Sequence, residues 1–391
     1  MRSVEQMASR KLTQQIAVFG ESGSGKTVLL SSFYGAAQEP EFSKENLFHV
    51  VADDVGQGHH LLRNYLGMRD SAATPGMNRF KADTYSFSIK LKDQPLGNQQ
   101  RAQPFDALQI VWHDYPGEWF EQEASSPTEA QRRVETFRSL LGSDIALLLV
   151  DAQRLLDNKG EEERYLKLLM GNLHNTLLSL KDELLEDGEQ LVEFPRIWML
   201  GLSKVDLVPE MDVFAFRDLM ISKVGPELGV LRETLEGFVQ GDDALAVGED
   251  FVLLSSAKFQ PGQILVKERI GVDLMLPLAA VFPFERHLRW KASMDLPGKV
   301  AENLVGGAEL LATALVGIKP FAKKLPRPLG ALFKFVNPSV IAEAANLVGD
   351  KLHELNAEAR RKNDNLTAAV TKFKLDLEEA QEQKILLESV Q

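Results

Sequence analysis

A glycine-rich turn near the start of the chain constrains the fold more than any other feature. It fits the pattern G-x-x-x-x-G-K-[ST], and its residues are Gly20, Glu21, Ser22, Gly23, Ser24, Gly25, Lys26 and Thr27. Residues 15–19 before it predict a short buried strand, and residues 28–37 after it predict a helix. Glycines let backbone N–H groups surround phosphate oxygens, and the helix N-terminus and the lysine add positive charge. The flanking strand and helix distinguish this turn from a chance glycine turn, so the sequence predicts a phosphate-binding loop.

Strands alternate with helical patterns along the next 270 residues. Continuous apolar runs at 145–150, 197–202 and 251–254 predict strands that are buried on both faces. Further strands are expected at 48–52, 83–92 and 107–112, and helices at 59–66, 129–141, 161–187 and 212–239. This alternation predicts an α/β fold with a doubly wound, mostly parallel sheet, followed by a helical C-terminal region.

The 391 residues are enough for one large domain or two. We expect a polar lead-in at 1–14, an α/β domain at 15–292 with an insertion at 38–73, and a helical region at 293–391. An apolar stripe in the last 50 residues predicts either a coiled-coil seam or a helix packed on the α/β domain, and we favour packing within the chain. Its members are Leu352, Leu355, Ala359, Leu366, Val370, Phe373, Leu377 and Ala380.

Composition excludes several classes of function. The chain has no cysteine, which excludes disulfides, zinc–thiolate sites, iron–sulfur clusters and cysteine catalysis. It lacks an N-terminal apolar segment and any uncharged apolar run of 18 residues, so we expect a cytoplasmic protein without a membrane span. Its net charge of −12 argues against nucleic acid as a partner. The basic stretch at 310–341 has two interpretations, a peripheral membrane contact or a helical hairpin that packs on the core.

Three more short motifs follow predicted strands in order. Residues 114–117 match D-x-x-G, with the carboxylate of Asp114 and the amide of Gly117 suited to Mg²⁺ and phosphate. Residues 203–206 resemble the guanine-reading motif [NT]-K-x-D, and residues 256–258 resemble the S-A-K loop beside it. Because the carboxyl ends of parallel strands meet at one edge of a sheet, we expect all of these residues around one ligand. The residues of the last two motifs are Ser203, Lys204, Asp206, Ser256, Ala257 and Lys258.

Taken together, the four motifs resemble the Ras-like, translation-factor-related class of P-loop GTPases over residues 15–290. This resemblance implies a Mg²⁺-dependent enzyme that hydrolyses GTP to GDP and phosphate and acts as a switch through its helical tail. It implies nucleotide binding by the first loop and the last two motifs, and a catalytic role for Lys26 and Gly117. One departure is Ser203, which stands where Asn or Thr is usual and keeps a small hydrogen-bonding side chain.

Two further site residues are suggested by the same resemblance. Thr74 precedes the strand that leads to D-x-x-G, so it is the candidate switch threonine, and with Thr27 and Asp114 it would hold Mg²⁺. The alternative is a loop threonine in an ordinary Pro-Gly turn. Glu118 either orients the attacking water or is an acidic residue at the start of a helix. Residues 114–119 resemble the corresponding stretch of the bacterial YcjX-like GTPases.

The sequence leaves the mode of action open. No arginine within the chain can be assigned to the transition state, so we expect slow hydrolysis without a partner or self-assembly. The partner would be a second copy or an effector that binds the C-terminal helices. The alternatives are a membrane-associated, dynamin-like mechanochemical GTPase and a nucleotide-binding scaffold that hydrolyses poorly.

Overall fold

The computed structural model describes most of the chain. The described residues are 13–76, 83–92, 109–114, 119, 126–185, 188–294, 297–300, 348–362 and 364–389, with only the backbone at Asp83, Asp114 and Ala292. Gly117, Glu118 and the basic stretch at 310–341 lie outside these residues.

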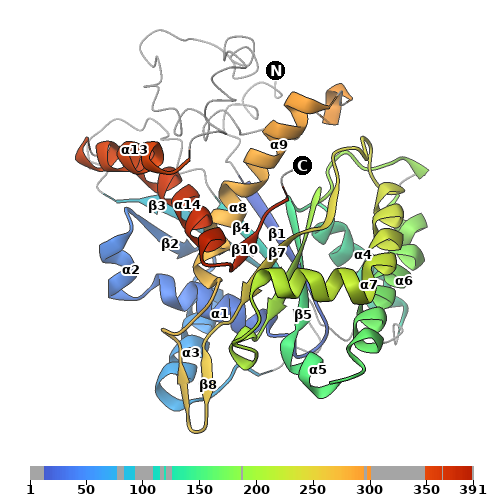
Figure 1. Ribbon diagram of the computed structural model, residues 1–391, viewed down its shortest axis with the longest axis horizontal. Coiled ribbons are helices and arrows are strands. Elements are labelled where there is room, and N and C mark those ends of the chain that lie inside the picture. The colour runs from blue at the N-terminus through green and yellow to red at the C-terminus, as the bar shows by residue number, and fades with distance from the viewer. Residues whose placement is uncertain are drawn as a thin grey trace.

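The described chain forms a three-layer α/β fold around an eight-stranded sheet, which confirms the predicted fold class (Figure 1). The strand order is β10-β7-β6-β5-β1-β4-β3-β2. The five strands from β7 to β4 are parallel, while β3, β2 and β10 run antiparallel to their neighbours. The strand bounds are β1 (Thr13–Phe19), β2 (Phe48–Ala52), β3 (Asp83–Leu91), β4 (Gln109–Asp114), β5 (Ile145–Asp151), β6 (Ile197–Ser203), β7 (Ala246–Leu254) and β10 (Leu386–Leu387).

The central strands are apolar throughout because both of their faces are covered. In β5, Leu147 and Leu149 join one hydrophobic cluster, whereas Leu148 and Val150 join the cluster on the opposite face. Successive side chains of a strand point to opposite faces, so only a continuous apolar run can fill both clusters. This arrangement explains why the runs at 145–150 and 197–202 were readable as strands.

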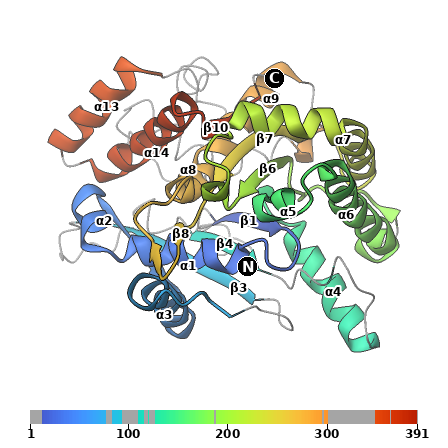
Figure 2. The ribbon, with the colours of Figure 1, turned by 60° about the horizontal axis from the view of Figure 1, so that its bottom comes forward.

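Helices cover both faces of the sheet (Figure 2). One face packs against α1 (Lys26–Ala37), α8 (Met275–Ala280), α9 (Phe282–Ser293) and α14 (Asn365–Glu382). The other packs against α4 (Pro127–Leu140), α5 (Ala152–Asp157), α6 (Glu162–Leu184) and α7 (Val213–Glu236). Within the described residues, the remaining helices are α2 (Pro40–Glu45), α3 (Val55–Ser71) and α13 (Asp350–Arg361).

The connections that follow β1 and β5 indicate where this sheet would bind a ligand. The chain leaves β1 through α1 on one face and leaves β5 through α5 on the other, although β1 and β5 are neighbours. Ligands of open α/β sheets bind at such a reversal, outside the carboxyl ends of the strands. A short hairpin of β8 (Lys258–Gln260) and β9 (Gln263–Leu265) comes after β7 in the chain. The sequence analysis did not predict this hairpin.

The C-terminal helices pack within the chain, as the favoured alternative predicted. Val370, Phe373, Leu377 and Ala380 of α14 are buried in the same cluster as the sheet and α8. The chain then continues into β10, which pairs with β7 at the edge of the sheet and was not predicted. The apolar stripe of α14 is therefore covered by its own chain.

A buried ion pair fixes this C-terminal segment. Arg286 of α9 donates to Asp250 of β7 over 2.5 Å, and both side chains are fully buried. The same carboxylate accepts the backbone N–H of Ser389 at 2.8 Å. The guanidinium also lies over the rings of Phe282 and Trp290. Helix α9, strand β7 and the C-terminal segment thus meet at one charge pair.

We expect Arg286→Met to lower the free energy of unfolding by about 3–5 kcal/mol, because it leaves a buried carboxylate without its counter-charge. The double variant Arg286→Met/Asp250→Leu removes both charges and should recover most of this loss. Urea unfolding measures both values. As a control, Arg164→Met breaks an exposed pair with Glu161 and should cost about 1 kcal/mol or less. Equal losses in Arg286→Met and Arg164→Met would contradict the role of the buried pair.

Candidate functional site

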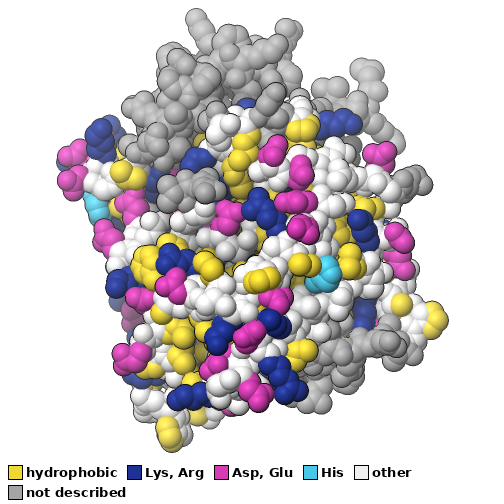
Figure 3. All heavy atoms as spheres, turned by 45° about the vertical axis from the view of Figure 1, so that its right-hand side comes forward, with side chains coloured by type: hydrophobic (Ala, Val, Ile, Leu, Met, Phe, Trp, Pro, Cys, Tyr) yellow, Lys and Arg dark blue, Asp and Glu magenta, His cyan; other side chains and the backbone are white. Residues whose placement is uncertain are grey.

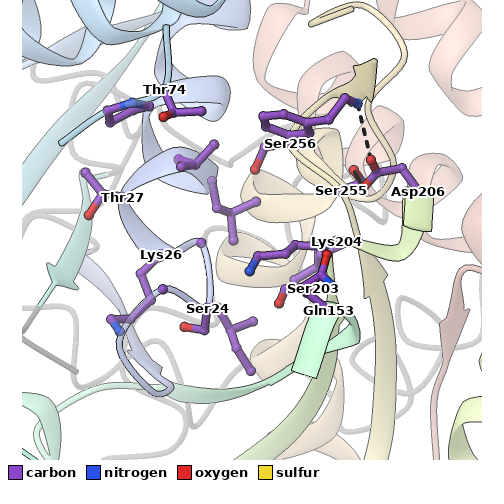
Figure 4. A pocket seen from close by; sticks show the side chains of 18 of the residues that line it. Ser24, Lys26, Thr27, Thr74, Gln153, Ser203, Lys204, Asp206, Ser255 and Ser256 are labelled. Atoms are coloured by element: carbon purple, nitrogen blue, oxygen red, sulfur yellow. Dashed lines mark hydrogen bonds between the residues drawn. The ribbon is translucent and has the colours of Figure 1, made fainter. Parts of the chain in front are cut away.

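A cavity of about 420 Å³ lies at the carboxyl edge of the sheet (Figure 4). Its wall is formed by residues 22–29, residues 74–76 and the segments that follow β6 and β7. A volume of this size suits a small-molecule ligand. The cavity therefore gathers segments that are up to 237 residues apart in the chain, from Ser22 to Phe259.

The glycine-rich loop forms one end of the cavity. Gly23 and Gly25 have φ angles of +82° and +94°, which a side chain disfavours, and they turn the loop toward the start of α1. The Nζ atom of Lys26 donates to the carbonyl oxygens of Gly20 at 2.7 Å and Glu21 at 3.1 Å. Gly20 and Glu21 do not line this cavity, whereas the six residues from Ser22 to Thr27 do. The cavity wall therefore includes the start of a helix and a lysine, a combination that suits an anionic ligand.

The buried hydroxyl of Ser24 also fits a ligand in this cavity. Ser24 is 1% exposed, and its Oγ atom has no hydrogen-bond partner among the residues that the structure describes. Buried hydroxyls are normally paired, so an unpaired one at the wall of a cavity suits a ligand acceptor.

The opposite end of the cavity carries the carboxylate of Asp206, in the 3₁₀ turn Val205–Leu207 after β6. Its Oδ1 atom accepts the hydroxyl of Ser255 at 2.6 Å, and its Oδ2 atom accepts the backbone N–H of Phe259 at 3.3 Å. Figure 4 shows the contact to the backbone as a dashed line. Sequence reasoning did not select Ser255, because only tertiary structure places its hydroxyl beside Asp206.

Lys204 has the left-handed conformation, with φ at +56°, and its side chain is held by an acidic partner. Its Nζ atom lies 2.6 Å from Oδ2 of Asp151, whose side chain is 4% exposed. Ser203 donates its hydroxyl to the carbonyl of Val150 on the neighbouring strand at 3.2 Å. Asp151 is a second functional candidate that sequence reasoning missed, although a charged residue at the end of an apolar strand is a usable signal.

The three residues of the S-A-K loop lie in different environments. Ser256 lines the cavity, and its carbonyl accepts the hydroxyl of Ser32 from α1 at 2.6 Å. Ala257 is fully buried. The side chain of Lys258 lies outside the cavity wall and pairs with Glu268 at 3.0 Å. The structure therefore brings Ser256 to the cavity but not the side chain of Lys258.

Two hydroxyls that could hold a magnesium ion lie on one side of the pocket. Figure 4 shows Thr27 and Thr74 there, away from Asp206, and both line the cavity. Asp114 ends β4, and its side chain is not described. No cluster of three or more His, Asp or Glu side chains able to hold a metal occurs among the described residues. Mg²⁺ commonly binds through one or two side chains together with ligand phosphates, so this sparse set of oxygen donors fits it.

Buried polar groups support the strand ends around the cavity. His113 on β4 lies near the hydroxyl of Thr84 at 3.3 Å and the side-chain oxygen of Gln15 at 3.1 Å. Burial lowers the pKa of His113 to about 4, so its ring is neutral at pH 7. Tyr165 accepts the backbone N–H of Asp151 at 3.1 Å, and burial raises the pKa of this phenol. His113 and Tyr165 therefore contact these strands as neutral groups, beside the ion pair of Lys204 with Asp151.

One protein-family model is similar to part of the chain. A family model described as Double-GTPase 2 matches residues 14–192, so over these residues the chain is similar to that family of GTPases. No curated protein sequence matches the chain. The narrower resemblance of residues 114–119 to YcjX-like GTPases stays a prediction.

Solved structures also resemble the chain. The signal recognition particle receptor SRb-GTP/SRX complex from Chaetomium thermophilum is 19% identical, with a TM-score of 0.32, over 64% of this chain and 93% of that one. The cytosolic domain of the T. maritima FeoB iron transporter, in its GMPPNP form, is 12% identical, with a TM-score of 0.27, over 92% and 98%. The GTP-bound GTPase-like domain of S. cerevisiae Ski7 is 13% identical, with a TM-score of 0.32, over 90% and 54%.

We expect Gly20→Ala to distort the glycine-rich loop. A Cβ atom at this position would lie 2.7 Å from Oγ of Ser24 and 3.1 Å from Cβ of Leu149. The free energy of unfolding should fall by about 1–3 kcal/mol, as for other overpacked sites. Gly76→Ala is the control, since its Cβ would meet nothing within 4 Å. Equal stability of the two variants in urea would contradict the close packing at Gly20.

Proposed function

We propose that this protein binds a guanine nucleotide together with Mg²⁺ and hydrolyses GTP to GDP and phosphate. The observation that carries the proposal is that one cavity has a phosphate-binding loop at one end and the fixed carboxylate of Asp206 at the other. The similarity of residues 14–192 to a family of GTPases supports it.

Base selection is assigned to Asp206. Each carboxylate oxygen has two acceptor sites, and each of these oxygens accepts one contact within the protein. The remaining sites suit the two N–H groups on the edge of guanine, which adenine does not present in this arrangement. Lys204 would lie along the base, with its ammonium group kept in place by Asp151.

Phosphate chemistry is assigned to the glycine-rich loop. Lys26 and the amides at the start of α1 would hold the phosphates, while the hydroxyls of Thr27 and Thr74 and the carboxylate of Asp114 would hold Mg²⁺. The bound ion would neutralise charge that develops on the phosphate oxygens. Gly117 would donate its amide to the γ-phosphate, and Glu118 would orient the attacking water. Without an arginine in place, hydrolysis should be slow.

A contact between β7 and the C-terminal segment supports the proposed switch through the tail. The N–H of Leu253 in β7 donates to the carbonyl of Ile385 at 2.8 Å, only two residues before Ser255. A shift of the Ser255 loop with nucleotide state would therefore reach the C-terminal segment. A homodimer or an effector would have to use the outer face of α13 and α14, because the apolar stripe of α14 is buried.

Along the described chain, no helix has the length and apolar character to cross a membrane.

Asp206→Asn tests base selection. An amide cannot accept from both guanine N–H groups, so the variant should lose about 1–3 kcal/mol of GTP binding and gain affinity for xanthosine triphosphate. Competition binding with the two nucleotides measures the exchange of preference. Asp218→Asn on α7 is the control, because this exposed carboxylate pairs with Arg217 and does not line the cavity. An unchanged preference in Asp206→Asn would refute the assignment.

Thr74→Ala tests the switch threonine. Thr74 would contact Mg²⁺ only beside a γ-phosphate, so GDP affinity should stay within about twofold while single-turnover hydrolysis falls by about tenfold or more. Thr74→Ser keeps the hydroxyl and should retain most of the rate. Thr84→Ala is the matched control, since the hydroxyl of Thr84 lies beside His113 and not in the cavity. Equal losses of GDP and GTP-analogue binding in Thr74→Ala would indicate a folding role instead.

A further inference from the structure

An exposed aromatic side chain stands at the wall of the cavity. Phe259 is 38% exposed, and it is the one large hydrophobic residue that is both exposed and part of the cavity wall within the described chain. Small-molecule sites are lined mainly by apolar and aromatic side chains, so a ring at the wall of such a cavity is placed to contact a ligand. This ring belongs neither to the hydrophobic core nor to the phosphate-binding loop.

The backbone of Phe259 is held by its neighbours, whereas its ring is partly exposed to solvent. Its N–H donates to Asp206, and its strand β8 pairs Phe259 with Ile264 of β9. Ile264 is 7% exposed and packs with Tyr65 and Ala257 in a small hydrophobic cluster. The hairpin therefore holds the ring next to the carboxylate that is assigned to base recognition.

The same cavity wall carries Lys204, whose ammonium group is engaged by Asp151 at 2.6 Å. Asp206 offers contacts only to the edge of a base, so the two faces of the base need other partners. An aromatic ring is suited to this task because every nucleobase has a π-face that stacks on it.

We propose that Phe259 stacks on the nucleobase of the bound nucleotide and supplies affinity, while Asp206 supplies selectivity. This inference rests on the proposed nucleotide-binding function. It separates two roles in one site, because stacking tolerates any base whereas the carboxylate reads one edge. Loss of the ring weakens binding of every nucleoside diphosphate by a similar factor and leaves the ratio of GDP to ADP affinity unchanged.

The test compares nucleotides with an anion that has no base. Phe259→Ala should weaken GDP binding by about 5- to 150-fold, the usual range for loss of one stacked base, and should change tripolyphosphate binding by less than twofold. Phe214→Ala is the control, because Phe214 is similarly exposed at 37% and does not line the cavity. Phe259→Trp should keep GDP affinity within about threefold, and GDP should quench its added fluorescence.

Phe259→Leu guards against misfolding, since it retains apolar volume without a π-face, and it should still weaken GDP binding. Unchanged GDP affinity in Phe259→Ala and Phe259→Leu would overturn the stacking role while leaving guanine binding intact. An equal loss of tripolyphosphate binding would also overturn it, because the phosphate loop would then depend on this residue. A wild-type protein that binds tripolyphosphate but no nucleotide would refute both this inference and the proposed function.

Discussion

The site depends on the parallel register of three strands. Asp151, Ser203 and Leu254 end β5, β6 and β7 in one row, because each pairs directly with the next across the sheet. The residues that follow this row therefore emerge side by side, and Lys204 reaches Asp151 while Ser255 reaches Asp206. Neighbouring strands are about 4.8 Å apart, a spacing that side chains can bridge. A slip by one residue would exchange the side chains that fill the two faces of the sheet and would separate these contacts. The register of these strands thus fixes which residues meet at the edge of the sheet.

Much of this architecture was predictable because it follows from local patterns. A strand that is buried on both faces requires a continuous apolar run, and the runs at 145–150 and 197–202 match β5 and β6 closely. The glycine-rich loop was recognisable because its positive φ angles require glycine at defined positions. Given parallel strands, the motifs after them had to share one edge, and Lys26, Lys204 and Asp206 do line one cavity. Their chemical roles remain proposals.

The remainder depends on contacts that no local pattern encodes. Ser255 and Ser256 are equivalent as sequence, and only the turn after β7 directs the hydroxyl of Ser255 to Asp206. Strand β10 is two residues long, and the segment around it is held by contacts to distant residues, among them the bond from Ser389 to Asp250. On the face shown in Figure 3, described acidic and basic side chains are interspersed and do not form a single-sign patch. Total charge alone could not indicate that distribution.

Nucleotide selectivity of the unmodified protein tests the central claim most directly. Isothermal titration with GDP, a non-hydrolysable GTP analogue and ADP, each in the presence of Mg²⁺, gives the affinities without any substitution. If Asp206 reads guanine, GDP should bind at least about fivefold more tightly than ADP, since an unmatched polar contact costs on the order of 1–3 kcal/mol. Equal affinity for GDP and ADP, or a preference for ADP, would contradict the account of this cavity as a guanine-nucleotide site.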